Sequence, residues 1–247
     1  MLLHVSENKE VAKGIWEMHL SGDFPFENVQ PGQFIHILIG SGREHVLRRP
    51  ISIAAIEAEK ETLVIVFRVV GEGTDWLAKR VEGDVLDVLG PLGTGFPLTT
   101  KQKILIVGGG IGVPPLYELI KRLWQQGNEI YCLLGFRNSD DVFWVEKFKE
   151  YGTVTTYTDD GSFGEKGLVT QRIAEDFLEK NWSNVYACGP VPMLKELKGI
   201  VANFSVEGYF SLEERMACGV GACYGCVCNN QRVCVEGPVF PMREVVL

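Results

Sequence analysis

The sequence predicts a β-barrel domain, a parallel α/β domain and a small C-terminal cysteine-loop module. Three observations support this prediction. Short β-branched and aromatic runs fill the first part of the chain, strand and helix patterns alternate in the middle, and five of the seven cysteines lie within residues 218–234. We therefore place the barrel in residues 1–99, the α/β domain in residues 100–203 and the cysteine module in residues 204–247.

The barrel is predicted from runs of β-branched and aromatic residues that Gly, Pro, Asn and Asp separate at short intervals. The runs are residues 4–9, 15–22, 33–40, 51–58, 62–70 and 85–93. This spacing is typical of a small antiparallel sheet closed into a barrel. One helix is expected to interrupt the barrel at Asp75–Val81, with Thr74 or Asp75 as its N-cap.

The α/β domain is predicted from a change of rhythm at Lys103, after which strands and helices alternate. Strands are expected at residues 104–107, 130–136, 153–158 and 184–187, and helices at residues 115–125, 144–150, 168–177 and 193–201. Such alternation favours a parallel sheet covered by helices.

The cysteine module has the order Cys218-x4-Cys223-x2-Cys226-x7-Cys234. The first three positions match the plant-type spacing of a [2Fe-2S] site, with the fourth cysteine downstream. Thiolates are soft ligands that suit iron. The interleaved glycines let the backbone approach the sulfur atoms closely and offer N–H groups to them. The module therefore predicts an iron–sulfur cluster.

Two alternatives accompany this prediction. A structural zinc ion also takes four cysteines, but zinc sites usually pair two C-x2–4-C hooks, whereas here one glycine-rich loop carries three ligands. Cys228 could replace Cys234 as the fourth ligand. We favour Cys234, because Cys228 lies only two positions beyond Cys226 and Asn229–Arg232 has the composition of a turn.

A flavin motif is expected where a predicted strand begins and where the predicted barrel helix begins. An arginine with a hydroxyl residue two or three positions further on can hold a pyrophosphate and a flavin edge together, and backbone N–H groups at a helix start can bind phosphate. A basic surface strand and a tight turn would look similar. The candidate residues are Arg49, Pro50, Ile51, Ser52, Gly73 and Thr74.

A nicotinamide motif is expected at two strand ends of the α/β domain. A glycine-rich turn follows the first strand and opens a helix, and a Cys-Gly-Pro segment follows the fourth; ligands of such sheets bind at the carboxyl ends of strands. A plain strand–helix connection and a buried core thiol are the alternatives. The candidate residues are Gly108, Gly110, Gly112 and Pro114 in the first segment, and Cys188, Gly189, Pro190 and Met193 in the second.

Together these motifs resemble the ferredoxin reductase superfamily over essentially the whole chain. Within it, the sequence is similar to the electron-transfer subunits of dihydroorotate dehydrogenase B, through Leu47–Ser52 and the cysteine-rich end from Glu214 onward. Ile51 departs from the aromatic residue that usually stands at this position of the superfamily. The resemblance implies that Val66, Phe67 and Arg68, besides the flavin motif, contact FAD and that Cys218, Cys223, Cys226 and Cys234 hold a [2Fe-2S] cluster.

The resemblance also implies the partner and the route of the electrons. The partner is an FMN-containing catalytic subunit that oxidises dihydroorotate to orotate, in a heterotetramer of two plus two subunits. Electrons pass singly from FMN through the cluster to FAD, which returns a hydride to NAD+ in pyrimidine biosynthesis. We assign no catalytic acid or base to this chain, because the cofactors carry the chemistry. An exposed apolar patch around Ala222, Tyr224 and Val227 is expected to face the partner.

Related subunits serve ferredoxin–NADP reductases and soluble hydrogenases. In the first group an aspartate tends to stand at the position of Cys218, so an all-cysteine set favours the dihydroorotate enzyme. The choice between NAD and NADP is open from the residues: Arg137 would suit a 2′-phosphate, whereas Asp140 and Asp141 would repel one. The resemblance favours NAD.

Charge and composition exclude several function classes. With 24 basic and 32 acidic residues the net charge is −8, which disfavours binding to nucleic acid or anionic membranes. No uninterrupted apolar run is long enough for a membrane-spanning helix. Residues 1–14 lack the apolar core of a signal peptide, and clustered cysteines in a reducing compartment indicate a metal site. We therefore expect a cytoplasmic protein without nucleic-acid or membrane partners.

Overall fold

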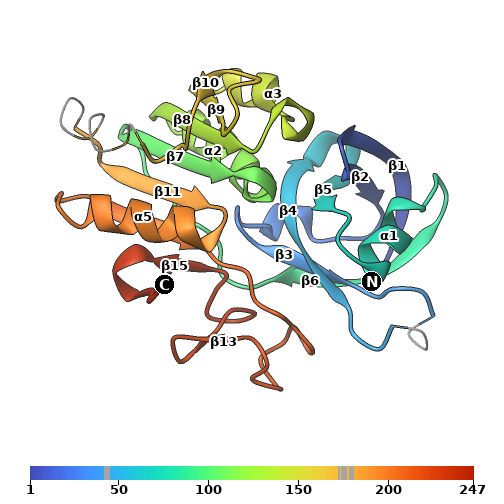
Figure 1. The fold of residues 1–247 in the computed structure, drawn as a ribbon. Coiled ribbons are helices and arrows are strands. Elements are labelled where there is room, and N and C mark those ends of the chain that lie inside the picture. Colours follow the sequence, from blue (N-terminus) through green and yellow to red (C-terminus); the bar gives the residue numbers. More distant parts are fainter. Residues whose placement is uncertain (42–44, 172, 174–176, 178–180) are drawn as a thin grey trace. The chain divides into compact units, whose positions relative to one another are not determined.

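The computed structural model describes residues 1–41, 45–171, 173, 177 and 181–247 (Figure 1). The chain forms two compact units. The first contains Met1–Gly95 together with Glu213–Val239, and the second contains Phe96–Leu212 together with Phe240–Leu247. The barrel and the cysteine loop, which comprises residues 218–234, therefore belong to one unit, although most of the other unit lies between them in the sequence.

The first unit is built on a closed six-stranded barrel, which confirms the predicted fold class. Each strand pairs antiparallel with its neighbours in the order β1-β2-β5-β4-β3-β6. The six predicted runs correspond to the six strands. These are β1 (Leu2–Ala12), β2 (Ile15–Ser21), β3 (Phe34–Ile37), β4 (Arg49–Glu57), β5 (Thr62–Arg68) and β6 (Val85–Leu92).

Alternation along the barrel strands sorts side chains into an inner and an outer set. Met18 and Leu20 of β2 and Ile35 and Ile37 of β3 belong to the buried core of the barrel. Because successive side chains of a strand point to opposite faces, His36 lies on the outer face of β3.

Helix α1 (Glu72–Ala78) begins and ends three residues before the predicted helix, so that prediction was wrong in its bounds. The reason is Thr74, which caps the helix from inside its first turn. Its Oγ1 accepts hydrogen bonds from the backbone N–H groups of Val70 (2.9 Å) and Gly71 (3.2 Å). Gly71 in extended conformation is the N-cap, a position that neither Thr74 nor Asp75 occupies.

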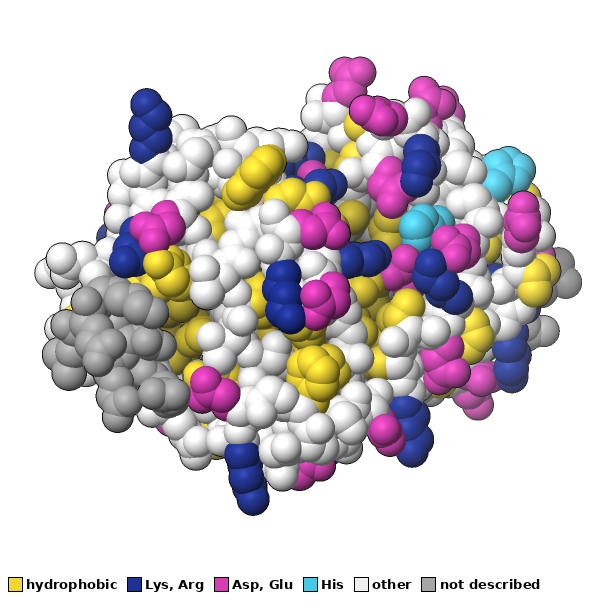
Figure 2. All heavy atoms as spheres, turned by 90° about the horizontal axis from the view of Figure 1, so that it is seen from above, with side chains coloured by type: hydrophobic (Ala, Val, Ile, Leu, Met, Phe, Trp, Pro, Cys, Tyr) yellow, Lys and Arg dark blue, Asp and Glu magenta, His cyan; other side chains and the backbone are white. Residues whose placement is uncertain are grey.

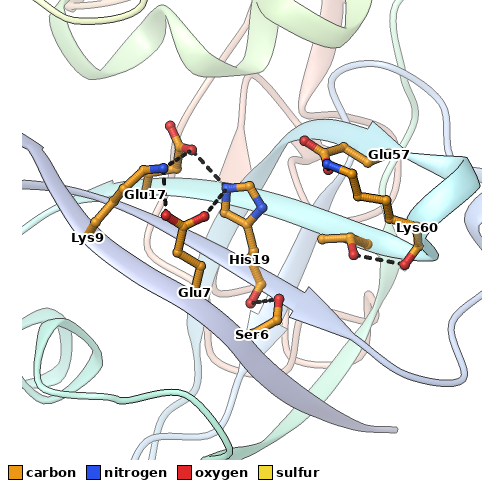
Figure 3. A network of polar contacts seen from close by, with 8 residues as sticks. Ser6, Glu7, Lys9, Glu17, His19, Glu57 and Lys60 are labelled. Atoms are coloured by element: carbon orange, nitrogen blue, oxygen red, sulfur yellow. Dashed lines mark hydrogen bonds and ion pairs between the residues drawn. The ribbon is translucent and has the colours of Figure 1, made fainter.

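Figure 3 shows a polar network on strands β1 and β2. Nε2 of His19 lies 2.8 Å from Oε1 of Glu17, and Nζ of Lys9 lies 2.7 Å from Glu7 and 3.6 Å from Glu17. The hydrogen bond from Lys9 holds the pKa of Glu7 below its usual value. Glu17 is only 2% exposed, so the network compensates the burial of a polar group that would otherwise be costly.

The second unit is built on a seven-stranded sheet in the order β10-β9-β8-β7-β11-β12-β15. The registered pairs from β10 to β12 are all parallel, which confirms the predicted α/β class. The strands are β7 (Lys103–Gly109), β8 (Glu129–Phe136), β9 (Thr153–Thr158), β10 (Glu165–Lys166), β11 (Asn184–Cys188), β12 (Glu207–Ser211) and β15 (Val239–Pro241). The sequence did not predict β10, β12 or β15.

Three helices of this unit match predicted helices within a few residues. They are α2 (Tyr117–Gln125), α3 (Val145–Lys149) and α5 (Val191–Val201). Pro114–Leu116 forms a 3-10 turn ahead of α2, with prolines at its first two positions, where a missing N–H group costs no helical hydrogen bond. Of the predicted helix at residues 168–177, residues 172 and 174–176 lie outside the described residues; residues 168–171 are not helical, whereas Ile173 and Phe177 are.

The cysteine loop of the first unit ends in a two-stranded hairpin. Its strands are β13 (Val227–Cys228) and β14 (Gln231–Arg232), joined by Asn229 and Asn230, which both have positive φ. Asparagine tolerates this conformation better than most residues, so the turn expected at 229–232 forms.

The surface of the described residues mixes charges of both signs. Acidic and basic side chains are interspersed on the face shown in Figure 2. Among the described residues, no helix is long and apolar enough to cross a membrane.

Candidate cofactor sites

The four predicted cluster ligands meet as two pairs in the first unit. The side chain of Cys223 lies beside that of Cys218, and the side chain of Cys226 lies beside that of Cys234. The second pair is buried, at 3% and 2% exposure, whereas Cys223 is exposed. No three His, Cys, Asp or Glu side chains of the described residues converge on one metal ion. Two cysteine pairs are the donor set that two iron atoms require.

Backbone N–H groups of the loop point at the cysteine sulfur atoms. The N–H of Val220 lies 3.5 Å from Sγ of Cys218, and that of Gly225 lies 3.4 Å from Sγ of Cys223. The Val220 hydrogen bond is the main reason that the pKa of Cys218 falls to about 6, and burial is the main reason that the pKa of Cys234 rises to about 11. N–H groups that stabilise a thiolate also suit a metal-bound sulfur. The residues therefore fit a [2Fe-2S] cluster.

Cys228 is separate from the two cysteine pairs. Its Sγ lies 3.4 Å from Nδ2 of Asn229, and the charge of Glu214, after burial, contributes to its raised pKa. Cys234, by contrast, has the side chain of Cys226 beside it. This placement supports Cys234 as the fourth ligand.

Arg232, at the end of the hairpin, braces the cysteine loop. Its Nη1 donates to the carbonyl of Gly221 at 3.0 Å, its Nε donates to Glu236 at 3.0 Å, and its guanidinium lies 5.0 Å from the ring centre of Tyr224. Glu236 raises the pKa of Arg232 above its ordinary value. One side chain thus connects the middle of the loop to the segment that carries Cys234.

The flavin motif is brought together on one side of the barrel. A Cβ atom on Gly73 would lie 2.7 Å from Nε of Arg49, so the guanidinium crosses directly over this glycine. Arg48 has a different role, because it binds Asp87 at 3.0 Å and the Asp87 carbonyl at 2.9 Å. Only Arg49 of the two arginines thus lies against the start of α1. An arginine fork beside a glycine backbone fits a pyrophosphate.

The other predicted FAD contacts differ in what they can offer. Phe67 is 2% exposed and belongs to the barrel core, and Ile51 packs against that core. Val66 lies on the face of β5 opposite to Phe67, and Ser52 lies on the face of β4 opposite to Ile51. Phe67 and Ile51 can therefore serve a flavin mainly through their backbone.

The two nicotinamide segments lie side by side in the second unit. Strands β7 and β11 are parallel neighbours, and Gly108 pairs with Cys188 in register. A Cβ on Gly112 would lie 2.5 Å from the carbonyl carbon and oxygen of Cys188. A Cβ on Gly189 would lie 2.6 Å from Cε of Met193. The glycines are therefore required for close packing of one loop on the other.

Open space remains beside this packed pair. Gly110 has a φ of 52° and no atom within 4 Å of where its Cβ would be, so its backbone faces outward. Pro114 and Cys188 are buried. Exposed glycine backbone at the carboxyl end of a parallel strand fits a dinucleotide.

Two segments of the chain match known protein-family models. Residues 213–246 match the iron–sulfur cluster binding domain of dihydroorotate dehydrogenase B, and residues 106–198 match the oxidoreductase NAD-binding domain. The chain is 48% identical over 252 residues to the dihydroorotate dehydrogenase B (NAD(+)) electron transfer subunit of Fusobacterium nucleatum, covering 98% of this chain and 96% of the relative. The subunit of the same name from Bacillus mycoides is 46% identical over 255 residues, covering 98% and 97%.

The chain belongs to the family of dihydroorotate dehydrogenase B electron transfer subunits. A solved structure described as an NADH-dependent reduced ferredoxin–NADP oxidoreductase, studied for flavin-based electron bifurcation, has the same fold. It superposes with a TM-score of 0.90 at 31% identity and covers 100% of this chain and 90% of its own. The family assignment and the fold were both predicted from the sequence, and both are confirmed.

Exposed apolar side chains lie on the cysteine loop. Tyr224 is 65% exposed, Val220 56% and Val227 42%. Ala222 is exposed beside them. The patch that the sequence predicted around Ala222, Tyr224 and Val227 is therefore on the surface of the first unit, and Val220 extends it.

Sequence reasoning missed two residues of this site, His36 and Arg232. Arg232 lies in β14 between Cys228 and Cys234, where a basic residue in an acidic protein was a usable signal. His36 gave no such signal, because its contact with the cysteine loop joins segments far apart in the sequence.

Proposed function

We propose that this chain is the electron-transfer subunit of an NAD-dependent dihydroorotate dehydrogenase. It takes electrons from an FMN-containing catalytic subunit, which oxidises dihydroorotate to orotate in pyrimidine biosynthesis, and delivers them to NAD+. The single observation that carries the proposal is the pairing of four cysteines in the compact unit that also holds the flavin motif. Membership of the family supports it.

The residues divide among three cofactors. Cys218 with Cys223, and Cys226 with Cys234, are each suited to one iron of a [2Fe-2S] cluster. The FAD set is Arg49, Pro50, Ile51, Ser52, Val66, Phe67, Arg68, Gly73 and Thr74. The NAD set is Gly108, Gly110, Gly112, Pro114, Cys188, Gly189, Pro190 and Met193.

These residues bind and position rather than react. When bound, the cluster carries single electrons, FAD exchanges single electrons for a hydride, and NAD+ takes the hydride. Arg49 supplies positive charge over the Gly73 backbone, loop N–H groups supply dipoles to the cysteine sulfur atoms, and the glycine backbone at Gly110 leaves room for a dinucleotide. No side chain of the chain is needed as an acid or base.

The proposal includes an assembly and a location. We infer a heterotetramer of two such chains and two catalytic subunits, in which the exposed patch around Tyr224 faces the partner. We also infer a cytoplasmic location, since clustered thiols suit a reducing compartment. The three functional segments, residues 1–99 for FAD, 100–203 for NAD and 204–247 for the cluster, remain predictions.

Anaerobic titration of the purified full chain with NADH tests this function. We expect a brown-yellow protein with flavin absorbance, whose FAD and two-iron EPR signals are reduced by NADH. With the catalytic subunit added, dihydroorotate should reduce the same centres. A colourless protein that contains zinc would overturn the proposal in favour of a structural scaffold.

A reductase subunit serving a ferredoxin or a hydrogenase is the second candidate. The 31% identity and high TM-score to the ferredoxin–NADP oxidoreductase structure favour it. Co-purification decides between the two. An affinity-tagged chain expressed at native level should retain an FMN-containing dihydroorotate dehydrogenase, whereas retention of a ferredoxin-linked or hydrogenase subunit would support the second candidate.

A further inference from the structure

His36 is an outer-face residue of the barrel that is nevertheless completely buried. Its neighbours Ile35 and Ile37 point into the barrel core, so the pleat of β3 directs His36 the other way. Its exposure is 0%. The cysteine loop explains the burial, because a Cβ on Gly219 would lie 2.5 Å from Nδ1 of His36 and 3.2 Å from Cε1. The ring therefore lies directly under the residue that follows Cys218.

The ring of His36 is unusual in its hydrogen bonding. Among the described residues, neither Nδ1 nor Nε2 has a hydrogen-bond partner, although both atoms are buried. Backbone groups of Cys218 and Arg48 lie near the ring without meeting hydrogen-bond geometry. An imidazole always carries at least one N–H, and leaving that group buried and unpaired costs free energy that an apolar side chain would avoid. A residue that only filled space here would be better apolar.

We propose that His36 is a positioning residue for the iron–sulfur cluster. The Nδ1 edge of its ring supports the backbone of Cys218 and Gly219 and stabilises the reduced form of the cluster. This inference rests on the proposed function, in which Cys218 is a ligand. Hydrogen-bond donors next to ligating sulfur atoms and their backbone set the reduction potential of such clusters. Gly219 has a φ of 71°, and glycine is the only residue type that lets the loop approach the ring so closely without strain.

Three variants of the full chain separate positioning through Nδ1 from simple packing. His36→Asn keeps a polar atom close to the position of Nδ1, His36→Gln keeps one closer to that of Nε2, and His36→Leu keeps neither. The midpoint potential of the cluster is measured by anaerobic redox titration followed by EPR. Iron content and FAD absorbance report whether the site and the barrel are intact. His4→Leu, at an exposed position on β1, is the matched control.

We expect the ratio of reduced to oxidised cluster, at one fixed ambient potential, to fall roughly fivefold in His36→Leu and His36→Gln. His36→Asn and His4→Leu should stay within about twofold of the unchanged chain. Equal potentials in all four variants would overturn the proposal. So would loss of the cluster from all three His36 variants with FAD retained, since His36 would then serve packing alone.

Different results would overturn the proposed function and the role of Nδ1. If the unchanged chain holds no two-iron cluster, the proposed function itself is wrong. If the unchanged chain holds the cluster and His36→Asn behaves as His36→Leu does, only the role of Nδ1 is wrong.

Discussion

The cysteine loop and the glycine-rich loop are both assigned to cofactors, yet the protein holds them in different ways. Gly112 packs against the backbone of Cys188 between two neighbouring parallel strands, so the sheet itself positions the glycine-rich loop. The cysteine loop is mostly exposed and is held by single side chains such as Arg232. The first loop is therefore formed by the fold, whereas the second depends on its ligands and on a few polar contacts.

The largest effect is expected at the fourth cluster ligand. Cys234→Ser should remove at least about 90% of the two-iron EPR signal, because a buried ligand of one cysteine pair is lost. Cys228→Ser, the matched control, should keep the signal, since Cys228 stands apart from both pairs. Iron content and EPR of the two purified proteins measure this. The opposite pattern would make Cys228 the ligand and remove the pairing on which the proposed function rests.

Gly112→Ala should damage the loop that the sheet positions. The new Cβ would lie 2.5 Å from backbone atoms of Cys188, which cannot rotate away as a side chain could. Overpacking of this kind costs about 1–3 kcal/mol of the free energy of unfolding, and displacement of the loop should weaken NADH binding about tenfold. Thermal unfolding and NADH titration measure the two effects.

Gly199→Ala is the control for this substitution. Gly199 lies in α5 with no atom within 4 Å of its Cβ position, so alanine should be neutral or stabilise by up to about 1 kcal/mol. Equal behaviour of the two variants would show that the backbone contact between the loops is unimportant.

The two loops also differ in how much of them the sequence could predict. Strand alternation and the glycine cluster place Gly108 and Cys188 at adjacent strand ends, because the topology of a parallel sheet follows from local patterns. Spacing likewise predicts Cys218, Cys223 and Cys226, since these ligands lie on one short loop. The contact of Gly219 with His36 joins segments separated by the whole α/β domain, and no local pattern encodes it. The same holds for β12 and β15, whose places in the sheet depend on the chain returning to it.

Arg232→Met should loosen the cysteine loop while leaving the barrel intact. The substitution removes the hydrogen bond to Gly221 and the ion pair with Glu236, which no other described contact replaces in kind. We expect the cluster to be lost in air about tenfold faster, with FAD absorbance unchanged. Arg243→Met is the control, because its side chain is 80% exposed and lies 3.9 Å from Glu244. If both variants lost the cluster at the rate of the unchanged chain, the loop would not need this brace.

The smallest effect is expected at the exposed edge of the cysteine loop. Tyr224→Asp places a charge in the apolar patch, which should weaken binding of the catalytic subunit about fivefold, roughly 1 kcal/mol, because interface aromatic residues contribute more than their neighbours. The cluster EPR spectrum should not change, since Tyr224 is not a ligand and is 65% exposed.

Phe163→Asp, an aromatic-to-acid change at a 40% exposed position of the second unit, is the control. Calorimetric titration with the catalytic subunit measures both. Unchanged affinity in Tyr224→Asp would remove this patch from the interface, whereas a changed spectrum would show that the loop transmits disturbances at its surface to its ligands.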